Sequence, residues 1–155
     1  MFVTRSRRIA YGDQLAAMDT DVVLWVPART SSIHLLRTVA ASAGARFDLS
    51  VDDIDDIRLA VTEAASQLLL TSRPRSRLCL RLAPEGHGVR LTVTIEGEPQ
   101  ATPLGSRASA QDTLEASLAW QVLLALGEEV RFVHDDIGVG VTFAKKARKP
   151  ARQHR

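Results

Sequence analysis

The sequence predicts an α+β fold, a two-layer sandwich in which three helices cover one face of a mostly antiparallel sheet. Three observations carry this prediction. The predicted elements run in the order β, α, α, β, β, loop, α, β, β, and adjacent strand pairs favour antiparallel pairing. The helices show an apolar stripe with a period of three to four residues, whereas the predicted strands over residues 77–82 and 89–95 alternate with a period of two. The length of 155 residues is typical of one domain.

The first part of the chain supplies a strand and a helix. Residues 21–26, DVVLWV, are β-branched and apolar, which is typical of a strand, and Pro27 should end it. Ser31 or Ser32 can cap the next helix, and Gly44 is its expected stop. The predicted apolar face of this helix comprises Leu35, Leu36, Val39, Ala40 and Ala43.

The clearest helix is predicted over residues 50–70. Ser50 and Asp53 fit a capping box, and Asp52 adds negative charge near the positive end of the helix dipole. The apolar stripe of this helix comprises Ile54, Ile57, Val61, Ala64 and Leu68.

A hairpin and a long loop follow. Residues 77–82 and 89–95 alternate between apolar and other side chains, on either side of a turn at residues 85–88. Residues 96–111 contain two prolines and two glycines and no hydrophobic period. A loop of this length in a compact domain is often a lid or a binding loop.

The last predicted elements are a helix over residues 112–126 and a closing hairpin over residues 130–144. Gly127 is the expected stop of the helix, and Trp120 is expected in the core. The predicted apolar stripe of the helix comprises Leu114, Leu118, Val122 and Ala125.

Composition excludes several classes of protein. No apolar run approaches the roughly 20 residues of a membrane-spanning helix, and the N-terminus lacks the apolar core of a secretory signal. Cys79 is the only cysteine, which rules out an internal disulfide and a thiolate metal cluster and fits a reducing compartment. We therefore expect a cytoplasmic protein with no membrane partner.

Charge is distributed unevenly along the chain. Residues 1–10 carry three arginines and residues 145–155 carry six Lys or Arg, with no acid in either stretch. Removing these nine charges from the net charge of +2 leaves −7 for residues 11–144. We predict a mobile N-terminal arm, a folded domain and a basic disordered tail, at residues 1–20, 21–146 and 147–155. The tail has no aromatic residues for base stacking, so we expect no direct nucleic-acid binding.

Glu63 is the residue of the 50–70 helix that its amphipathic pattern does not explain. It lies outside the polar face of Arg58, Thr62 and Ser66, and it shares a line with Gln67. A carboxylate and an amide, four residues apart, therefore point the same way at the edge of apolar surface. This line is either a solvated helix edge or a binding or catalytic edge, where the carboxylate polarises water beside an amide that holds a metal-bound ligand.

The order of elements and two local motifs resemble a known family. Val26-Pro-Ala-Arg29 leads into Leu35-Leu-Arg37, and the run from Asp53 to Glu63 precedes the amide at position 67. The chain resembles the GHKL ATPase fold and, more narrowly, the bacterial anti-sigma factors of the RsbW type, which are also serine kinases. The similarity covers residues 22–146. It implies ATP and magnesium as ligands, a homodimer, a sigma factor as partner and a STAS-type anti-anti-sigma protein as second partner.

The resemblance also implies roles for individual residues. Glu63 would be the catalytic residue that polarises the attacking hydroxyl. Gln67 would help to hold magnesium and phosphates at the place of the family's N-box asparagine. Glu96 and Gly97 fall on the adenine-reading box, Asp-x-Gly-x-Gly. The Gly-Thr element before the final strand, also nucleotide-binding in the family, falls on Gly138, Gly140 and Thr142.

Arg37 is the implied partner-binding residue. His34 precedes it by three residues and lies on the same side of the predicted helix. Both residues are either solvated helix surface or contacts to the sigma factor and its competitor.

Three departures weaken the implied nucleotide site. Gln67 is one methylene longer than asparagine. Ile95 stands at the aspartate position, or Glu96 if the register slips by one, and Pro99 replaces the second glycine. Residues 115–120 contain no glycine where the family wraps the phosphates. The sequence therefore predicts an anti-sigma factor with weakened or lost ATP binding; the alternative is an active ATP-dependent serine kinase that phosphorylates an anti-anti-sigma factor.

Overall fold

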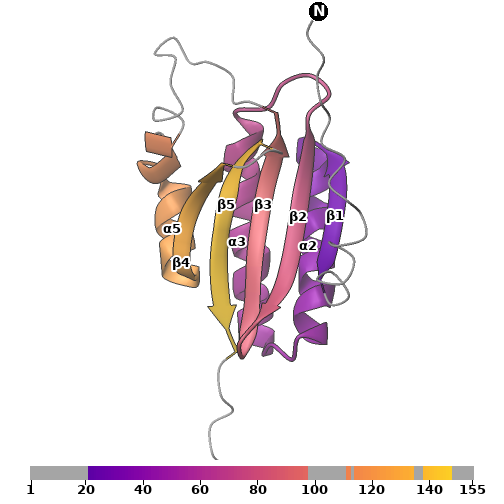
Figure 1. Cartoon of the computed structure of the whole chain (residues 1–155), viewed down its shortest axis with the longest axis vertical. Coiled ribbons are helices and arrows are strands. Elements are labelled where there is room, and N and C mark those ends of the chain that lie inside the picture. The colour runs from indigo at the N-terminus through magenta and orange to yellow at the C-terminus, as the bar shows by residue number, and fades with distance from the viewer. Residues whose placement is uncertain (1–20, 98–110, 113, 135–137, 148–155) are drawn as a thin grey trace, which may run out of the picture.

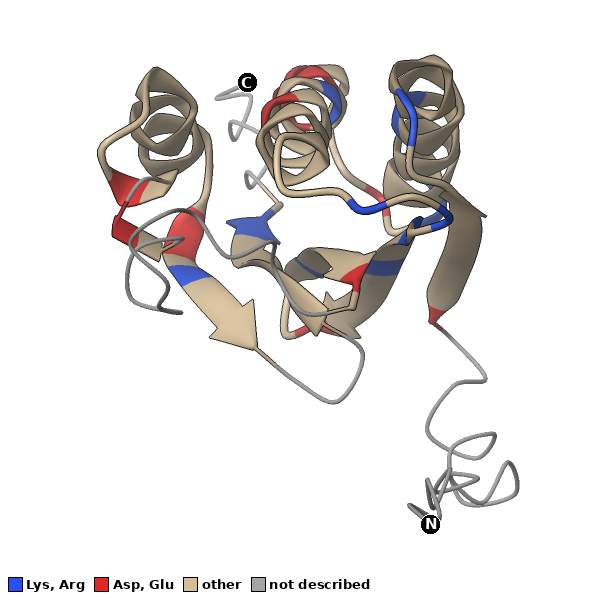
Figure 2. Ribbon diagram, turned by 90° about the horizontal axis from the view of Figure 1, so that it is seen from above, with Lys and Arg blue, Asp and Glu red and all other residues tan. Residues whose placement is uncertain are grey.

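The computed structural model describes residues 21–97, 111–112, 114–134 and 138–147 (Figure 1). Helices α2 (Thr30–Arg46), α3 (Val51–Leu69) and α5 (Leu118–Leu126) lie on one face of a five-stranded sheet (Figure 2). The strands are β1 (Val22–Pro27), β2 (Arg77–Glu85), β3 (Gly88–Glu96), β4 (Glu128–His134) and β5 (Gly138–Lys146). Their order is β1-β2-β3-β5-β4, and neighbouring strands pair antiparallel. The predicted α+β sandwich is confirmed.

The core lies between the sheet and the helices. Alternate residues of β2 and β3 are fully buried against the helix layer, because side chains on a strand alternate between its two faces. The sequence prediction for both strands is confirmed, and Gly86 forms the β2–β3 turn with a φ of +57°. The inward-facing residues are Leu78, Leu80, Leu82, Val89, Leu91, Val93 and Ile95.

Helix α2 begins and ends differently from the prediction. Its N-cap is Arg29, which makes no side-chain capping bond, and Ser32 is buried inside the helix. Gly44 is also buried within the helix. Helix α3 lies so close to it that a Cβ there would be 3.1 Å from Ile57 and 3.2 Å from Ile54. The predictions of a serine cap and a glycine stop were therefore wrong. The glycine allows two helices to approach closely and does not end α2.

Helix α3 begins as predicted. The Ser50 hydroxyl accepts a hydrogen bond from the Asp53 N–H at 3.1 Å and donates one to Asp53 Oδ2 at 2.6 Å. This satisfies an N–H group that a helix terminus leaves without an intrahelical partner. The predicted stripe is buried at Ile57, Val61, Ala64 and Leu68.

The predicted helix over residues 112–126 is interrupted, so that prediction was wrong. The Ser117 hydroxyl donates to the Leu114 carbonyl at 2.6 Å and accepts from the Trp120 N–H at 3.1 Å. The hydroxyl thus ends one helical turn and caps α5, which shifts the phase of the buried face. Leu118 is 80% exposed, whereas Trp120 and Leu123 are buried. Trp120 lies in the core as predicted.

Several predicted segments lie outside the described residues. These are the arm over residues 1–20, most of the loop over residues 96–111 and the tail over residues 148–155. Among the described helices, none combines the length and apolarity needed to cross a bilayer.

Candidate functional site

The side of α3 that faces α5 is anchored by a lysine from the sheet. Lys145 of β5 donates from Nζ to Asp56 Oδ2 at 2.6 Å and to the Leu126 carbonyl at 3.0 Å. Asp53, which is fully buried, places Oδ1 3.7 Å from the same ammonium group. One positive charge therefore joins the N-terminal half of α3, the end of α5 and the end of β5.

Glu63 and Gln67 lie on the same line of α3 as Asp56. Residues seven and eleven positions further along a helix return to nearly the same side, so both side chains point toward the α5 side of α3. Both residues are half-buried, and neither side chain forms a hydrogen bond or ion pair with the described part of the chain. The structure thus brings together the carboxylate and the amide that the sequence singled out.

The Glu96 side chain lies on the face of the sheet that the helices do not cover. Arg77 donates to its carboxylate through Nε and Nη2, at 2.9 and 2.8 Å, and the same guanidinium lies 4.7 Å from the ring centroid of Trp25. The hydrogen bonds from Arg77 lower the pKa of Glu96, and the same contacts raise the pKa of Arg77. This carboxylate is therefore already paired with a guanidinium of the same chain.

Ile95 points to the other face of the sheet, into the core. It is 2% exposed and packs within the hydrophobic cluster. The adenine end of the implied site therefore has no acceptor at position 95. Gly97 follows with a φ of +96°, a conformation that favours glycine.

Gly138, Gly140 and Thr142 occupy alternate positions of β5 and face away from the helices. A Cβ at Gly140 would overlap the Val93 carbonyl oxygen, and one at Gly138 would overlap the Ile95 carbonyl oxygen. The close approach of β3 therefore explains why both residues are glycine.

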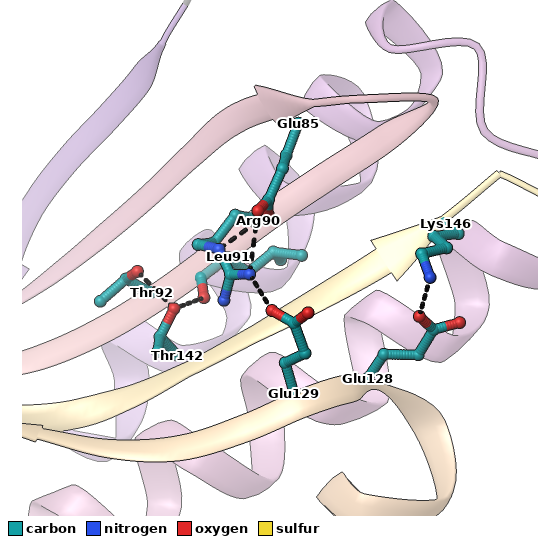
Figure 3. A network of polar contacts seen from close by, with 8 residues as sticks. All are labelled: Glu85, Arg90, Leu91, Thr92, Glu128, Glu129, Thr142 and Lys146. Atoms are coloured by element: carbon teal, nitrogen blue, oxygen red, sulfur yellow. Dashed lines mark hydrogen bonds and ion pairs between the residues drawn. The ribbon is translucent and has the colours of Figure 1, made fainter.

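Thr142 is bonded within the sheet. Its hydroxyl donates to the Leu91 carbonyl at 3.1 Å and lies 3.1 Å from the Thr92 hydroxyl (Figure 3).

On the same open face of the sheet, Arg90 bridges Glu85 and Glu129. A hollow of about 370 Å³ lies there, lined by Cys79, Arg81, Thr92, Thr94, Val133, His134 and Thr142. The predicted nucleotide residues thus fall into two groups on opposite faces of the sheet.

Arg37 lies on the side of α2 that faces α3, because it precedes the α3-packing Gly44 by seven residues. It is half-buried, and His34 is exposed one turn earlier. The predicted partner-binding residues therefore lie on the helix layer, close to the seam between α2 and α3.

The residues present fit magnesium and ATP only in part. Gln67 and Glu63 offer an amide and a carboxylate on one helix line, whereas the adenine end lacks its acceptor and Glu96 is paired. Within the described ranges, no group of three His, Cys, Asp or Glu residues is placed to hold a metal ion. The site as a whole does not fit the adenine recognition that the resemblance implied.

Comparison with known families matches residues 26–145 to the histidine kinase-like ATPase domain. The chain belongs to this family. It is also similar to the protein named anti-sigma-F factor RsbW in two strains of Mycobacterium tuberculosis, CDC 1551 / Oshkosh and ATCC 25618 / H37Rv. In each case the identity is 30% over 115 residues, covering 74% of this chain and 62% of the relative. The chain thus spans less than two-thirds of the length of these relatives.

Two features of this domain were missed from the sequence. The first is the pairing of Arg77 with Glu96, for which a signal existed: counting outward from the turn at residues 85–88 places them opposite each other. The second is the contact of Lys145 with Asp56, which joins residues 89 positions apart. No local pattern indicates the second contact.

Proposed function

We propose that this protein is an anti-sigma factor that binds a sigma factor and keeps it from RNA polymerase. The similarity to the two RsbW anti-sigma-F factors carries the proposal, and membership of the histidine kinase-like ATPase domain family supports it. Holding a partner requires a stable shaped surface and not an intact nucleotide site. Release by a STAS-type anti-anti-sigma protein, a homodimer and a cytoplasmic location belong to the same proposal.

Weakened or lost ATP binding is part of this proposal. Burial of Ile95 in the core and the pairing of Glu96 with Arg77 both support it, because neither side chain is available to the adenine amino group. Without that acceptor, the base would lose the contact that fixes its orientation. Magnesium, if it binds, would be held from the line of α3 that carries Gln67.

The second candidate is an active serine kinase that phosphorylates an anti-anti-sigma partner. One observation favours it: Glu63 and Gln67 share a half-buried helix line, and neither side chain is engaged by other described residues. In such a kinase Glu63 would polarise the attacking hydroxyl of the partner. Phosphoryl transfer depends mainly on positioning and charge neutralisation, so the paired Glu96 weighs against this candidate.

The test uses the full chain with the sigma factors and STAS-type proteins of the same genome. Complex formation and transfer of labelled phosphate are measured separately, with and without magnesium and ATP. We expect a stable complex with at least one sigma factor that nucleotide does not change. Phosphate transfer that disappears in Glu63→Ala would establish the kinase, and absence of any sigma complex would refute the anti-sigma proposal.

Arg37→Ala tests whether the sigma factor binds to the surface of the helix layer that contains Arg37. We expect it to weaken sigma binding about tenfold while the melting temperature stays within a few degrees, because Arg37 is only half-buried and does not belong to the hydrophobic core. Arg46→Ala, in the last turn of the same helix, is the matched control and should bind normally. If Arg37→Ala unfolds the protein, Arg37 has a structural role.

A further inference from the structure

Two turns meet at the N-terminal end of α2, and both carry exposed arginines. The Ala28 N–H of the β1–α2 turn donates to the Ser76 carbonyl of the α3–β2 turn at 2.9 Å. This bond holds the backbone segments that carry Arg29 and Arg75 beside each other, and both arginines are exposed. Figure 2 shows basic segments beside this end of α2, whereas acidic segments gather on α3 and near β4.

The α3–β2 turn holds Arg75 in a conformation that arginine rarely adopts. The Ser76 N–H donates to the Arg73 carbonyl at 3.1 Å, which closes a four-residue turn with Pro74 at its second position. Arg75 stands at the third position with a φ of +68°. This position of such a turn favours glycine or asparagine, so the turn itself gives no reason for an arginine.

Arg29 and Arg75 contribute two exposed positive charges to this end of α2. Neither forms an ion pair with a residue in the described ranges, whereas Arg77 in the next strand is bound to Glu96. Helix α2 contains no acidic residue, and Arg37 continues the positive charge along it. Residues 11–144 carry a net charge of −7, so this corner differs in sign from the domain that contains it.

We propose that Arg29 and Arg75 form a docking corner for a carboxylate-rich segment of a partner protein. This inference rests on the proposed function, in which the bound molecule is a protein, and the corner extends the surface that contains Arg37. The planar guanidinium donates two parallel hydrogen bonds to one carboxylate, so two neighbouring arginines select paired acidic side chains. Duplex DNA is a poorer fit, because its binders typically use six to ten phosphate contacts spread along a track.

The test compares two variants of the full chain. Arg29→Gln with Arg75→Gly removes both guanidiniums, and glycine suits the backbone at position 75, so the fold should be at least as stable at that turn. The control is Arg46→Gln at the other end of α2, roughly 25 Å away. The probes are a synthetic ten-residue polyglutamate peptide and the sigma factor captured in the binding panel.

We expect the double variant to lose at least fivefold in affinity for both probes, and the control to stay within twofold of the parent chain. The peptide should also shift the arginine Nε–Hε NMR signals of Arg29 and Arg75. Unchanged affinity of the double variant for both probes overturns the inference and leaves the proposed function standing. Peptide binding at Arg29 and Arg75 without any sigma complex refutes the proposed function and supports the corner. Equal affinity for a ten-base-pair duplex at the same salt concentration overturns the assignment to carboxylates.

Discussion

At the end of β3, two neighbouring residues point to opposite faces of the sheet and have different environments. Ile95 packs in the core, and Glu96 accepts two hydrogen bonds from Arg77 on the open face of the sheet. A strand alternates its side chains, so a slip of one residue exchanges these environments. Of the two, only the side chain at position 95 points to the helix side of the sheet, where it could contact a nucleotide. That side chain is an isoleucine, which cannot accept a hydrogen bond.

We expect Glu96 to titrate below the ordinary glutamate range, because Arg77 stabilises its ionised form. The folded pKa is lower than the unfolded pKa, so the pair stabilises the fold fully above the unfolded pKa and loses its contribution as pH falls through the folded pKa. The effect on stability should be small, because both side chains are more than one-third exposed. NMR titration of the carboxyl carbon measures the pKa. Arg77→Gln should raise it, and an identical midpoint in both proteins would show that the ion pair does not form.

Ile95→Asp, which would restore the family's acidic residue, should destabilise the protein by about 3 kcal/mol or more, because it buries a carboxylate in an apolar cluster. Urea denaturation measures the free energy of unfolding. Ile95→Val is the control and should cost only about 1 kcal/mol. A well-folded Ile95→Asp protein with increased ATP affinity would show that position 95 still borders an adenine pocket.

At the scale of the elements, glycines and one lysine determine how strands and helices approach each other. Gly140 allows β5 to lie close to the backbone of β3, and Gly44 allows α2 to lie close to α3. Lys145 then ties β5 to the helix layer. These contacts hold α3, and with it the line of Glu63 and Gln67, in a fixed position over the sheet.

Gly140→Ala should destabilise the protein by about 2–4 kcal/mol, because a Cβ would overlap the Val93 carbonyl and force β3 and β5 apart. Gly86→Ala is a useful comparison: it has a positive φ but open space around it, so strain alone should cost about 1 kcal/mol. Thermal and urea unfolding measure both. Equal costs for the two variants would mean that β3 adjusts easily, and that Gly140 needs a reason other than packing.

Lys145→Met should cost about 3 kcal/mol, because it removes the ammonium group that lies beside buried Asp53 and that pairs with Asp56. A double-mutant cycle with Asp56→Asn measures the coupling between the two side chains. Lys146→Met is the matched control: its ammonium is exposed and pairs with Glu128 at the surface, so little change is expected. No coupling between Lys145 and Asp56 would contradict the anchoring role.

For the whole molecule, the arrangement separates two surfaces. The helix layer carries the α3 line and the arginines at the N-terminal end of α2, whereas the open face of the sheet carries the Arg77–Glu96 pair and the threonine-lined hollow. A partner that binds the helix layer therefore need not contact the open face.

Addition of 1 mM magnesium and ATP should raise the melting temperature by only about 1–2 °C. A dissociation constant near 1 mM stabilises the folded state by about 0.4 kcal/mol at this concentration, and a chain of this size gains about 2–4 °C per kcal/mol. Differential scanning fluorimetry with magnesium and without nucleotide is the control. A rise of about 8 °C or more would indicate micromolar affinity and contradict the weakened site.

Several features of the site were within reach of sequence reasoning because they are local. The helical period placed Glu63 and Gln67 on one line, and Ser50 marked the start of α3 by its hydrogen bond three residues away. The same reasoning failed at Gly44 and Ser117. A glycine looks alike whether it ends a helix or lies under another helix, and a serine inside an apolar helical run gives no local sign that it will cap a new one.

The sequence by itself determined the class of fold, the order of the elements and the buried stripe of α3, because these follow from periodicity over a few residues. It placed Leu35 and Leu118 on apolar faces, yet both are exposed. Only the tertiary structure decided which faces meet. Lys145 and Lys146 read as the start of a basic run, yet β5 directs the first toward α3 and the second toward Glu128. Such contacts join residues far apart along the chain. They depend on strand register and helix packing, which are set by the burial of the whole core at once.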